Sequence, residues 1–248
     1  MKHIRAIVVA AIMAAFLSSS ATAGEIKSCV AIKATEPRMP DGIQRAWGQT
    51  SKFWPRNSQL RVRFLAGTAK QKDEAWKRFQ IVDNITNLTF VRVDSGASEV
   101  RVRFDYGKGH WSYLGTDCRV VPQSSQTMNL ELKAGVFGDA GYEWDRVAIH
   151  EMCHAIGLEH EHQSPKATNL VWNRAAVYDY YGRTQGWSKQ QIDFQVLNRS
   201  TATSIIASKW DSKSIMEYPI PQGLANIVVG WNDKLTALDI ATLKSIYP

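Results

Sequence analysis

The chain has 248 residues, of which 44% are hydrophobic and 21% are charged, and its formal net charge is +7. These values exclude a disordered, collagen-like or repetitive chain, and the length suits one domain of about 200 residues once a targeting segment is removed. Lysine and arginine are scattered and form no basic run, so the charge does not indicate binding to nucleic acid.

The N-terminus has the pattern of a secretory signal peptide. Lys2 and Arg5 precede an apolar run over residues 6–17, and the small-residue triplet at 21–23 has the A-x-A form of a cleavage site. We therefore predict that residues 1–23 are removed and that the protein is secreted, either to the extracellular space or to the periplasm. The apolar run is shorter than the roughly 20 residues of a spanning helix, and no other stretch is long enough, so we expect no membrane span.

The next segment, residues 24–52, has no sustained apolar period. We interpret this segment, which contains Pro37 and Pro40, as a short prosegment or N-terminal extension that precedes a main domain at 53–248. An odd number of cysteines in an exported protein means that at least one thiol is free, bound to a metal or paired with another chain, so the protein is not a disulfide scaffold. The three cysteines are Cys29, Cys118 and Cys153.

The main domain begins with a strand and an amphipathic helix. Residues 60–64 alternate between apolar and basic side chains, which predicts a strand, and residues 71–82 place Ala75, Trp76 and Phe79 on one helical face. An order with strands first and helices later predicts an α+β fold. Four further strands are expected at 88–93, 100–104, 111–114 and 128–132.

The second half is predicted to contain several helices. Residues 145–158 have a helical period and contain neither Pro nor Gly before Gly157, which is expected to end the helix. Later helices have their own start signals, because capping boxes begin at Ser188 and Thr236, and the last helix extends to about Ile246. Loops rich in Gly, Pro and Asn separate these helices.

One short segment of the first of these helices carries the chemistry. His150 and His154 are four residues apart and share a helical face, from which both imidazoles can approach one ion. A residue ten positions beyond His150 would lie about 15 Å away if the helix continued. Gly157 removes this problem because it can take a left-handed turn, after which the chain folds back and His160 completes the site.

Three neutral imidazoles on Zn²⁺ leave a fourth position for water, which is typical of a catalytic zinc site rather than a structural one. Glu151, adjacent to a ligand, would take a proton from this water and pass it to the leaving amine. The pattern predicts a hydrolase with one catalytic zinc ion, in which Glu151 is the general base. The predicted metal ligands are His150, His154 and His160.

Two other functions are open at this stage. The chain could be a catalytically inactive zinc-binding or adhesion module, although the intact Glu151 argues against it, since Gln or Ala there would have favoured that interpretation. It could also be a zinc-dependent cell-wall hydrolase that acts on polysaccharide. A casein or gelatin assay with a chelator control would separate both from an endopeptidase.

The extended pattern of histidines and glycine, with a methionine downstream, resembles the metzincin zinc proteases, and within them the astacin-like family. Residues 160–162 (HEH) are similar to the sequence that the family has at its third ligand. Residues 214–218 (SIMEY) resemble the Met-turn, and residues 111–115 (WSYLG) resemble the family's WSYVG strand. The resemblance covers about residues 53–248.

This resemblance implies a secreted zinc metalloendopeptidase (EC 3.4.24 type) that cleaves extended polypeptides, and we expect a monomer. It also implies a metzincin-type fold, with a twisted mixed sheet and helices in an N-terminal subdomain and a mostly irregular or helical C-terminal subdomain after Gly157. Met216 would lie beneath the imidazoles as an apolar floor, and Tyr218 would be a movable zinc ligand that swings away to stabilise the oxyanion. The substrate would add as a further strand to the edge formed by Trp111, Ser112, Tyr113 and Leu114.

Two residues of the predicted prosegment could keep such an enzyme latent. A Cys29 thiolate would be a strong zinc ligand in the position of the water, and Asp41 could do the same with a carboxylate, as the aspartate of astacin prosegments does. A chain without a latency device is the remaining alternative. The chain departs from the family at Ser164, where Arg is usual, and at Glu217, where His is usual; it also lacks the family's disulfide cysteines.

Three further residues near these motifs are expected to have no direct role in the chemistry. Cys153 points about 100° away from His154 on the helix and is interpreted as a packing residue. His110 and His162 are expected either at the surface or in contact with the metal ligands.

Overall fold

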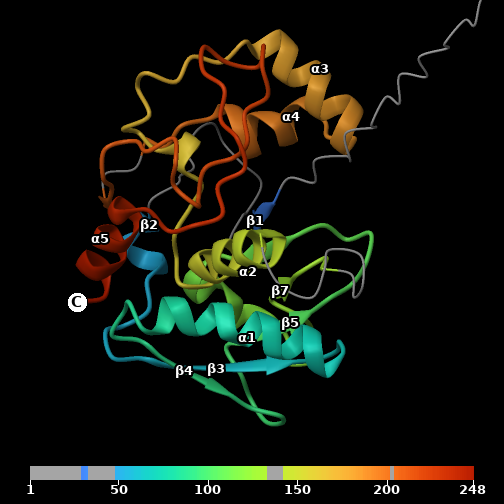
Figure 1. Ribbon diagram of the computed structural model, residues 1–248, viewed down its shortest axis with the longest axis vertical. Coiled ribbons are helices and arrows are strands. Elements are labelled where there is room, and N and C mark those ends of the chain that lie inside the picture. Colours follow the sequence, from blue (N-terminus) through green and yellow to red (C-terminus); the bar gives the residue numbers. More distant parts are fainter. Residues whose placement is uncertain (1–28, 33–47, 133–141, 202–203) are drawn as a thin grey trace, which may run out of the picture.

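The structure is a computed structural model with a strand-rich N-terminal part and a C-terminal part of helices and loops (Figure 1). The predicted signal peptide at 1–23 and the candidate latency residue Asp41 lie outside the described residues. Within the described residues, no helix combines the length and the apolar character needed to cross a membrane. The described ranges are 29–32, 48–132, 142–201 and 204–248.

A mixed sheet of six strands in the order β1-β6-β7-β5-β3-β4 forms the base of the N-terminal part. β6 runs antiparallel to β7, and all other neighbouring pairs are parallel. Because side chains alternate along a strand, Leu60 and Val62 are buried while Arg61 pairs with Glu99 at 2.7 Å outside the core. The strands are β1 (Val30–Ile32), β3 (Gln59–Phe64), β4 (Thr89–Arg92), β5 (Val100–Arg103), β6 (Trp111–Tyr113) and β7 (Met128–Asn129).

Two helices, α1 (Ala69–Asp83) and α2 (Tyr142–Ala155), pack against each other and against this sheet (Figure 1). α1 begins with a capping box, in which the side chains and backbone N–H groups of Thr68 and Gln71 bond reciprocally. Arg78 of α1 donates to the carboxylate of Asp145 in the first turn of α2 at 2.8 Å. These contacts fix the axis of α2, the helix that carries the first two candidate ligands.

After Gly157 the chain forms a second hydrophobic cluster with fewer regular elements. The last helix, α5, returns to the first cluster, where Leu243, Ile246 and Tyr247 are buried. The helices are α3 (Arg174–Gln185), α4 (Lys189–Ile192), a π-helical turn (Asp193–Leu197) and α5 (Ala237–Ile246). A separate two-stranded sheet joins β2 (Gly48–Gln49) to β8 (Ile205–Ile206), and 3₁₀ turns are formed by Thr50–Lys52, Gly115–Val120 and Glu161–Gln163.

The α+β prediction is confirmed, and the differences from the sequence analysis are local. Every expected strand is present, although those after β3 are shorter than expected. α2 ends at Ala155 rather than at 158, and both capping boxes, at Ser188 and Thr236, are present. α3 was not predicted. Its available signal was Asn173, whose side-chain oxygen accepts from the N–H of Ala176 at the start of the helix.

Gly157 follows the end of α2 in a conformation that favours glycine. Its φ is 103°, and a Cβ built on it would lie 2.7 Å from Cδ1 of Phe53. We predict that Gly157→Ala lowers the free energy of unfolding by about 2–4 kcal/mol, because left-handed strain adds to overpacking; urea unfolding measures this loss. Gly96→Ala is the matched control, since Gly96 also has a positive φ of 82° but no atom within 4 Å of its Cβ position. Equal losses in the two variants would contradict the role given to the Phe53 contact.

Candidate metal centre

Three imidazoles meet at the C-terminal end of α2. His150 and His154 lie one helical turn apart, and the turn at Gly157 brings His160 back toward them. The ring centroid of His154 lies 4.6 Å from those of both other histidines, and the remaining pair is 5.3 Å apart. All three rings are buried. The structure therefore brings the predicted ligands together.

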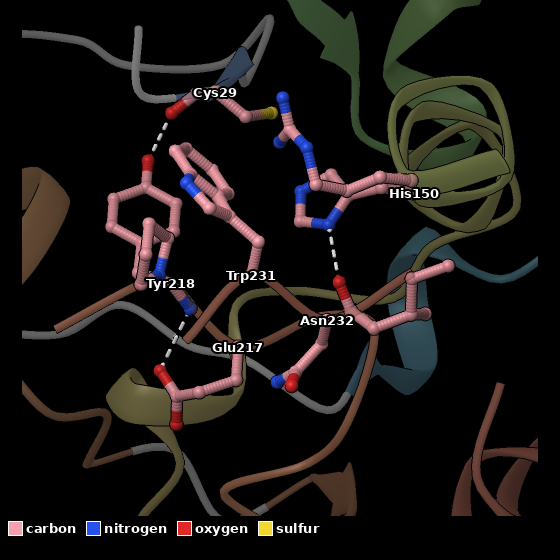
Figure 2. A pocket seen from close by; sticks show the side chains of 9 residues that line it. Cys29, His150, Glu217, Tyr218, Trp231 and Asn232 are labelled. Atoms are coloured by element: carbon pink, nitrogen blue, oxygen red, sulfur yellow. Dashed lines mark hydrogen bonds between the residues drawn. The ribbon is translucent and has the colours of Figure 1, made fainter. Parts of the chain in front are cut away.

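The outer ring nitrogens are held by backbone carbonyls. Nδ1 of His150 lies 2.7 Å from the carbonyl oxygen of Ile215 (Figure 2), and Nδ1 of His154 lies 2.6 Å from that of Leu158. Since a carbonyl oxygen only accepts, each Nδ1 carries the proton and each Nε2 presents a lone pair to the interior. Burial lowers the pKa of His150 to about 4, so this ring is neutral at pH 7, as a metal ligand must be.

The inner nitrogens fit a zinc ion. Nε2 of His154 and Nε2 of His160 are 3.1 Å apart, close to the about 3.3 Å that separates two nitrogen ligands on tetrahedral zinc. Nε2 of His150 is buried and has no hydrogen-bond partner among the described residues. Unprotonated nitrogens this close repel each other unless a cation or a proton lies between them, so the donor set suits Zn²⁺.

A fourth donor comes from the predicted prosegment. One ligand atom of Cys29 lies within 4.8 Å of a ligand atom of each of the three histidines. Cys29 immediately precedes β1, and the pairing of β1 with β6 sets the position of the thiol. Burial raises the pKa of this thiol well above its usual value. One of the two candidate latency residues thus faces the imidazoles, whereas the structure says nothing about Asp41.

Glu151 is fully buried on α2 and faces the same centre. Neither carboxylate oxygen meets a nitrogen or oxygen donor among the residues that the structure describes, and the polar group beside it is the Cys29 thiol. Burial raises the pKa of Glu151 to about 8, and the neighbouring Cys29 thiol and Arg146 guanidinium lower it in part. An unpaired buried carboxylate destabilises a fold, so its presence at this position indicates a functional role.

Tyr218 and Met216 come from the segment that resembles a Met-turn. The Tyr218 hydroxyl donates to the carbonyl oxygen of Cys29 (Figure 2), and its ring centroid lies 4.3 Å from that of His160. Met216 is buried in the first hydrophobic cluster, and its carbonyl accepts from the N–H of Glu161 at 2.9 Å. Tyr218 is therefore close to the imidazoles, but its hydroxyl bonds to the predicted prosegment.

β6 lies beside the centre, but in this structure it is not an edge strand. β1 pairs with it in parallel from Trp111 to Tyr113, and the N–H of Leu114 donates to the carbonyl of Ile32 at 2.8 Å. Ser112 is buried between these residues. The edge that was expected to receive a substrate is thus covered by residues of the predicted prosegment.

His110 and His162, for which a surface position was considered, are both buried and lie next to polar groups in the interior. Nδ1 of His110 accepts from the N–H of Glu131 at 3.0 Å. His162 stacks on His160 with ring centroids 5.5 Å apart, and its Nδ1 lies 3.2 Å from the carboxylate of Glu217. The surface alternative is therefore wrong for both, and Glu217, which departs from the family pattern, lies beside His162.

The C-terminal helix is bonded to this centre through two side chains. Asp239 of α5 accepts from the hydroxyl of Ser214 at 2.6 Å and from the N–H of Ile215 at 3.1 Å. The hydroxyl of Tyr247 donates to the carbonyl of Ile156, just beyond α2, at 2.6 Å. Sequence reasoning assigned these residues only to the capping and packing of the helix.

A small pocket lined by Cys29, His150 and Tyr218 lies beside the imidazoles (Figure 2). Sequence reasoning missed four of its residues, among them Arg146 and Trp231, whose guanidinium and indole ring lie 4.1 Å apart. Arg146 had a signal, because it precedes His150 by one helical turn, but Trp231 had none. The walls comprise Cys29, Arg146, His150, Ile215, Glu217, Tyr218, Pro219, Trp231 and Asn232.

Comparisons with known proteins agree with this geometry. The family model described as Astacin, a peptidase family, matches residues 47–247. One solved structure of myroilysin is 35% identical to this chain, with a TM-score of 0.77, and the match covers 81% of this chain and 98% of that one. A second myroilysin structure is 33% identical, with a TM-score of 0.62 and coverage of 84% and 90%.

A more distant likeness concerns the fold alone. High choriolytic enzyme 1, a hatching enzyme zinc-protease from the medaka fish Oryzias latipes, is 17% identical, with a TM-score of 0.54 over 82% of this chain and 96% of that one. Among curated proteins, none matches the chain.

Proposed function

The chain belongs to the astacin family of zinc metalloendopeptidases, and from this premise we propose that it is a secreted endopeptidase in which Glu151 is the general base. The observation that carries this proposal is the buried carboxylate of Glu151, which meets no nitrogen or oxygen donor among the described residues and lies beside the Cys29 thiol that clusters with the three imidazoles. A water molecule that attacks a peptide bond would provide the missing partner.

The residues of the centre would divide the reaction between them. When held by His150, His154 and His160, zinc supplies Lewis acidity that acidifies water and polarises the scissile carbonyl. Glu151 would accept a proton from the attacking water and donate it to the nitrogen of the leaving amine. Burial raises the pKa of Glu151 to about 8, and the Cys29 thiol and the Arg146 guanidinium offset this effect only in part.

Tyr218 would act on the oxygen of the scissile carbonyl. Its hydroxyl is a hydrogen-bond donor, and in this structure the carbonyl of Cys29 accepts from it. Once Cys29 leaves, the same donor becomes available to the developing oxyanion, where such donors contribute most. Met216, buried next to this segment, would keep the floor of the centre apolar.

An extended polypeptide would bind where β1 now lies. β1 already pairs with β6 from Trp111 to Tyr113, which supports the capacity of this edge to bind a main chain. Main-chain pairing gives affinity for many sequences, and pockets beside the strand would add specificity. The substrate strand would therefore replace the prosegment strand.

We further propose that Cys29 keeps the proenzyme latent. Its thiol shares one cluster with the three imidazoles, its carbonyl engages Tyr218, and the following residues cover β6. These three contacts would block the fourth metal position, the oxyanion donor and the substrate edge together. Asp41 remains the alternative latency ligand.

We also propose that the protein is exported and then matured by removal of its prosegment. The signal-peptide pattern at 1–23 supports export, and the contacts of Cys29 and β1 support a prosegment within 24–52, ahead of a catalytic domain at 53–248. N-terminal sequencing of the secreted protein would locate both cleavage sites. We expect the mature enzyme to be a monomer, which size-exclusion chromatography would test.

Zinc removal is expected to abolish the activity and to weaken the fold. The mature protein should contain one zinc ion per chain and cleave casein, and a chelator should remove both properties until zinc is restored. At free zinc about 1,000 times its Kd, the loss of binding would lower the free energy of unfolding by about 4 kcal/mol, which calorimetry measures as a lower melting temperature.

The same samples would separate the rival functions. An inactive zinc-binding module would contain zinc and leave casein intact, and a cell-wall hydrolase would degrade purified cell walls but not casein. Either result would overturn the proposed endopeptidase.

A further inference from the structure

We propose that a second pocket, between the segment that leads into α3 and the residues after the π-helical turn, binds an acidic stretch of the polypeptide substrate away from the scissile bond (Figure 1). In the described part of the chain, this basic pocket and the pocket beside the imidazoles share no wall residue. The inference rests on the proposed function and adds a binding site to it. The walls of the basic pocket include Leu170, Val171, Trp172, Arg174, Asn198 and Arg199.

Arg199 carries a charge that its surroundings do not balance. The side chain is half-buried, and its Nη2 donates to the backbone carbonyl of Leu170. Burial lowers the pKa of this guanidinium, and no acidic side chain of the described residues offsets that effect. An arginine is nevertheless charged at neutral pH. A partly desolvated charge without a counter-ion destabilises a fold, so its presence favours a ligand of opposite charge.

The other polar groups of the walls also suit an anion. Arg174 is 55% exposed at its side chain, and its Nη2 donates to the carboxylate of Asp193 at 2.7 Å, which leaves its other N–H groups for a ligand. Nε1 of Trp172 is a further donor without a partner among the described residues. Asn198 supplies a side-chain amide, and the walls contain neither Asp nor Glu. Because donors predominate, a carboxylate is the protein group that fits.

The backbone on both sides of the unbalanced arginine is fixed by Gln163. Nε2 of Gln163 donates to the carbonyl of Asn198 at 3.2 Å, and the carbonyl of Gln163 accepts from the N–H of Ser200 at 3.1 Å. In the segment that leads into α3, the N–H of Val171 donates to Oδ1 of Asn226 at 2.9 Å. The pocket is therefore preformed, and a ligand loses little free energy in ordering it.

An apolar surface lies next to these donors. The side chain of Val171 is 61% exposed, although it belongs to the walls of the pocket. A large apolar group left exposed beside unpaired donors is typical of a binding surface rather than of plain solvent-facing structure. The pocket thus suits an acidic side chain with an apolar neighbour, which a polypeptide supplies and an inorganic anion does not.

The basic pocket lies near the metal centre. The ring of Trp172 lies 5.9 Å from that of His162, and His162 stacks on the ligand His160 with centroids 5.5 Å apart. An extended chain advances about 3.3–3.6 Å per residue, so a long substrate can reach the pocket from the scissile bond, whereas a very short one cannot. Binding at both sites would lower the KM of long acidic substrates and leave their kcat unchanged.

The first test uses the proenzyme, in which Cys29 and β1 cover the metal centre and the substrate edge, so that peptide binding reports on other sites. The probes are fluorescein-labelled decapeptides with an alternating Asp-Leu tract, or with Asn in place of Asp. Fluorescence anisotropy should show the Asp peptide binding at least about 10-fold more tightly, as expected for a hydrogen bond between charged groups. Arg199→Ala should abolish this preference, and Arg199→Lys should keep part of it.

Further variants separate binding from damage to the fold. Arg174→Ala removes an exposed side chain and should weaken binding of the Asp peptide, without a change in melting temperature. Arg183→Ala is the matched control, because this arginine pairs with Asp179 on the exposed face of α3, and it should leave binding unchanged. Heparin is the competing anion. If heparin binds in a manner that depends on Arg199 and the Asp peptide does not bind, the ligand is not a polypeptide and the assignment is wrong.

The second test uses the matured enzyme and distinguishes the two levels of the proposal. A long fluorogenic substrate with a distant Asp-Leu tract should have a KM about 10-fold lower than its Asn counterpart, and Arg199→Ala should remove that difference. If no substrate is cleaved, the proposed function fails, while the anisotropy assay still decides whether the pocket binds an acidic peptide. If the Asp and Asn peptides bind the proenzyme equally, or if the preference survives in Arg199→Ala, the pocket has another role.

Discussion

Glu151→Gln is expected to bind zinc normally and to cleave peptides about 10²- to 10⁴-fold more slowly than the unaltered enzyme. Glutamine has nearly the shape of glutamate and fits the same buried space, but it cannot accept a proton from water. Glu151 is not among the four residues whose donor atoms cluster, so the metal content should not change. A fluorogenic peptide assay and metal analysis of the same sample measure both quantities.

Glu99→Gln is a matched control for this result. Glu99 pairs with Arg61 beside the sheet, so its loss should affect stability slightly and turnover little. A Glu151→Gln enzyme that retains its full rate would exclude Glu151 as the base. A variant that loses both its zinc and its activity would show that Glu151 supports the metal ligands instead.

Cys29→Ala is expected to give a proenzyme that cleaves peptides before maturation, at least about 10²-fold faster than the unaltered proenzyme. The thiol is tethered to the main chain beside the imidazoles, and such tethering gives a weakly competing ligand a high effective concentration. The variant should remain slower than the mature enzyme, because β1 still covers β6. Assays of intact and matured protein side by side measure both differences.

Cys118→Ala is the matched control for Cys29. Cys118 is also a buried free thiol, but Arg101 donates to its carbonyl, and Cys118 is not among the residues whose donor atoms cluster with the imidazoles. This variant should stay latent. If Cys29→Ala is as inactive as the unaltered proenzyme while the matured form is active, latency has another source, such as Asp41.

The sequence alone predicted those parts of the site whose residues lie close together along the chain. The spacing of His150 and His154 and the turn at Gly157 follow from helix geometry, so eleven residues sufficed to propose a zinc site. The partners that orient the rings could not be deduced in this way. The carbonyl of Ile215, which fixes the ring of His150, comes from 65 residues further along the chain, and no short pattern encodes that contact.

The same reason explains the errors in the fold. Alternating side chains predicted where strands occur, but the length of each strand depends on how far its neighbour remains in register, so the strands after β3 are shorter than expected. α3 buries only Val177 and Tyr181, which is too sparse a stripe to predict a helix. Arg146 was overlooked as a pocket residue because Trp231, its stacking partner, lies 85 positions away.

The hydrogen bonds that Asp239 of α5 and Tyr247, directly after it, make beside the metal centre have a consequence for biosynthesis. The ribosome synthesises the three histidines well before it reaches Asp239 and Tyr247. Until α5 emerges from the ribosome, the N–H of Ile215 cannot donate to the carboxylate of Asp239. The carbonyl of Ile156, just beyond α2, likewise cannot accept from the hydroxyl of Tyr247. A nascent chain that ends before α5 therefore lacks the bonds that hold Ile215 and the end of α2, and we expect the centre to be fully ordered only after the last helix has been translated.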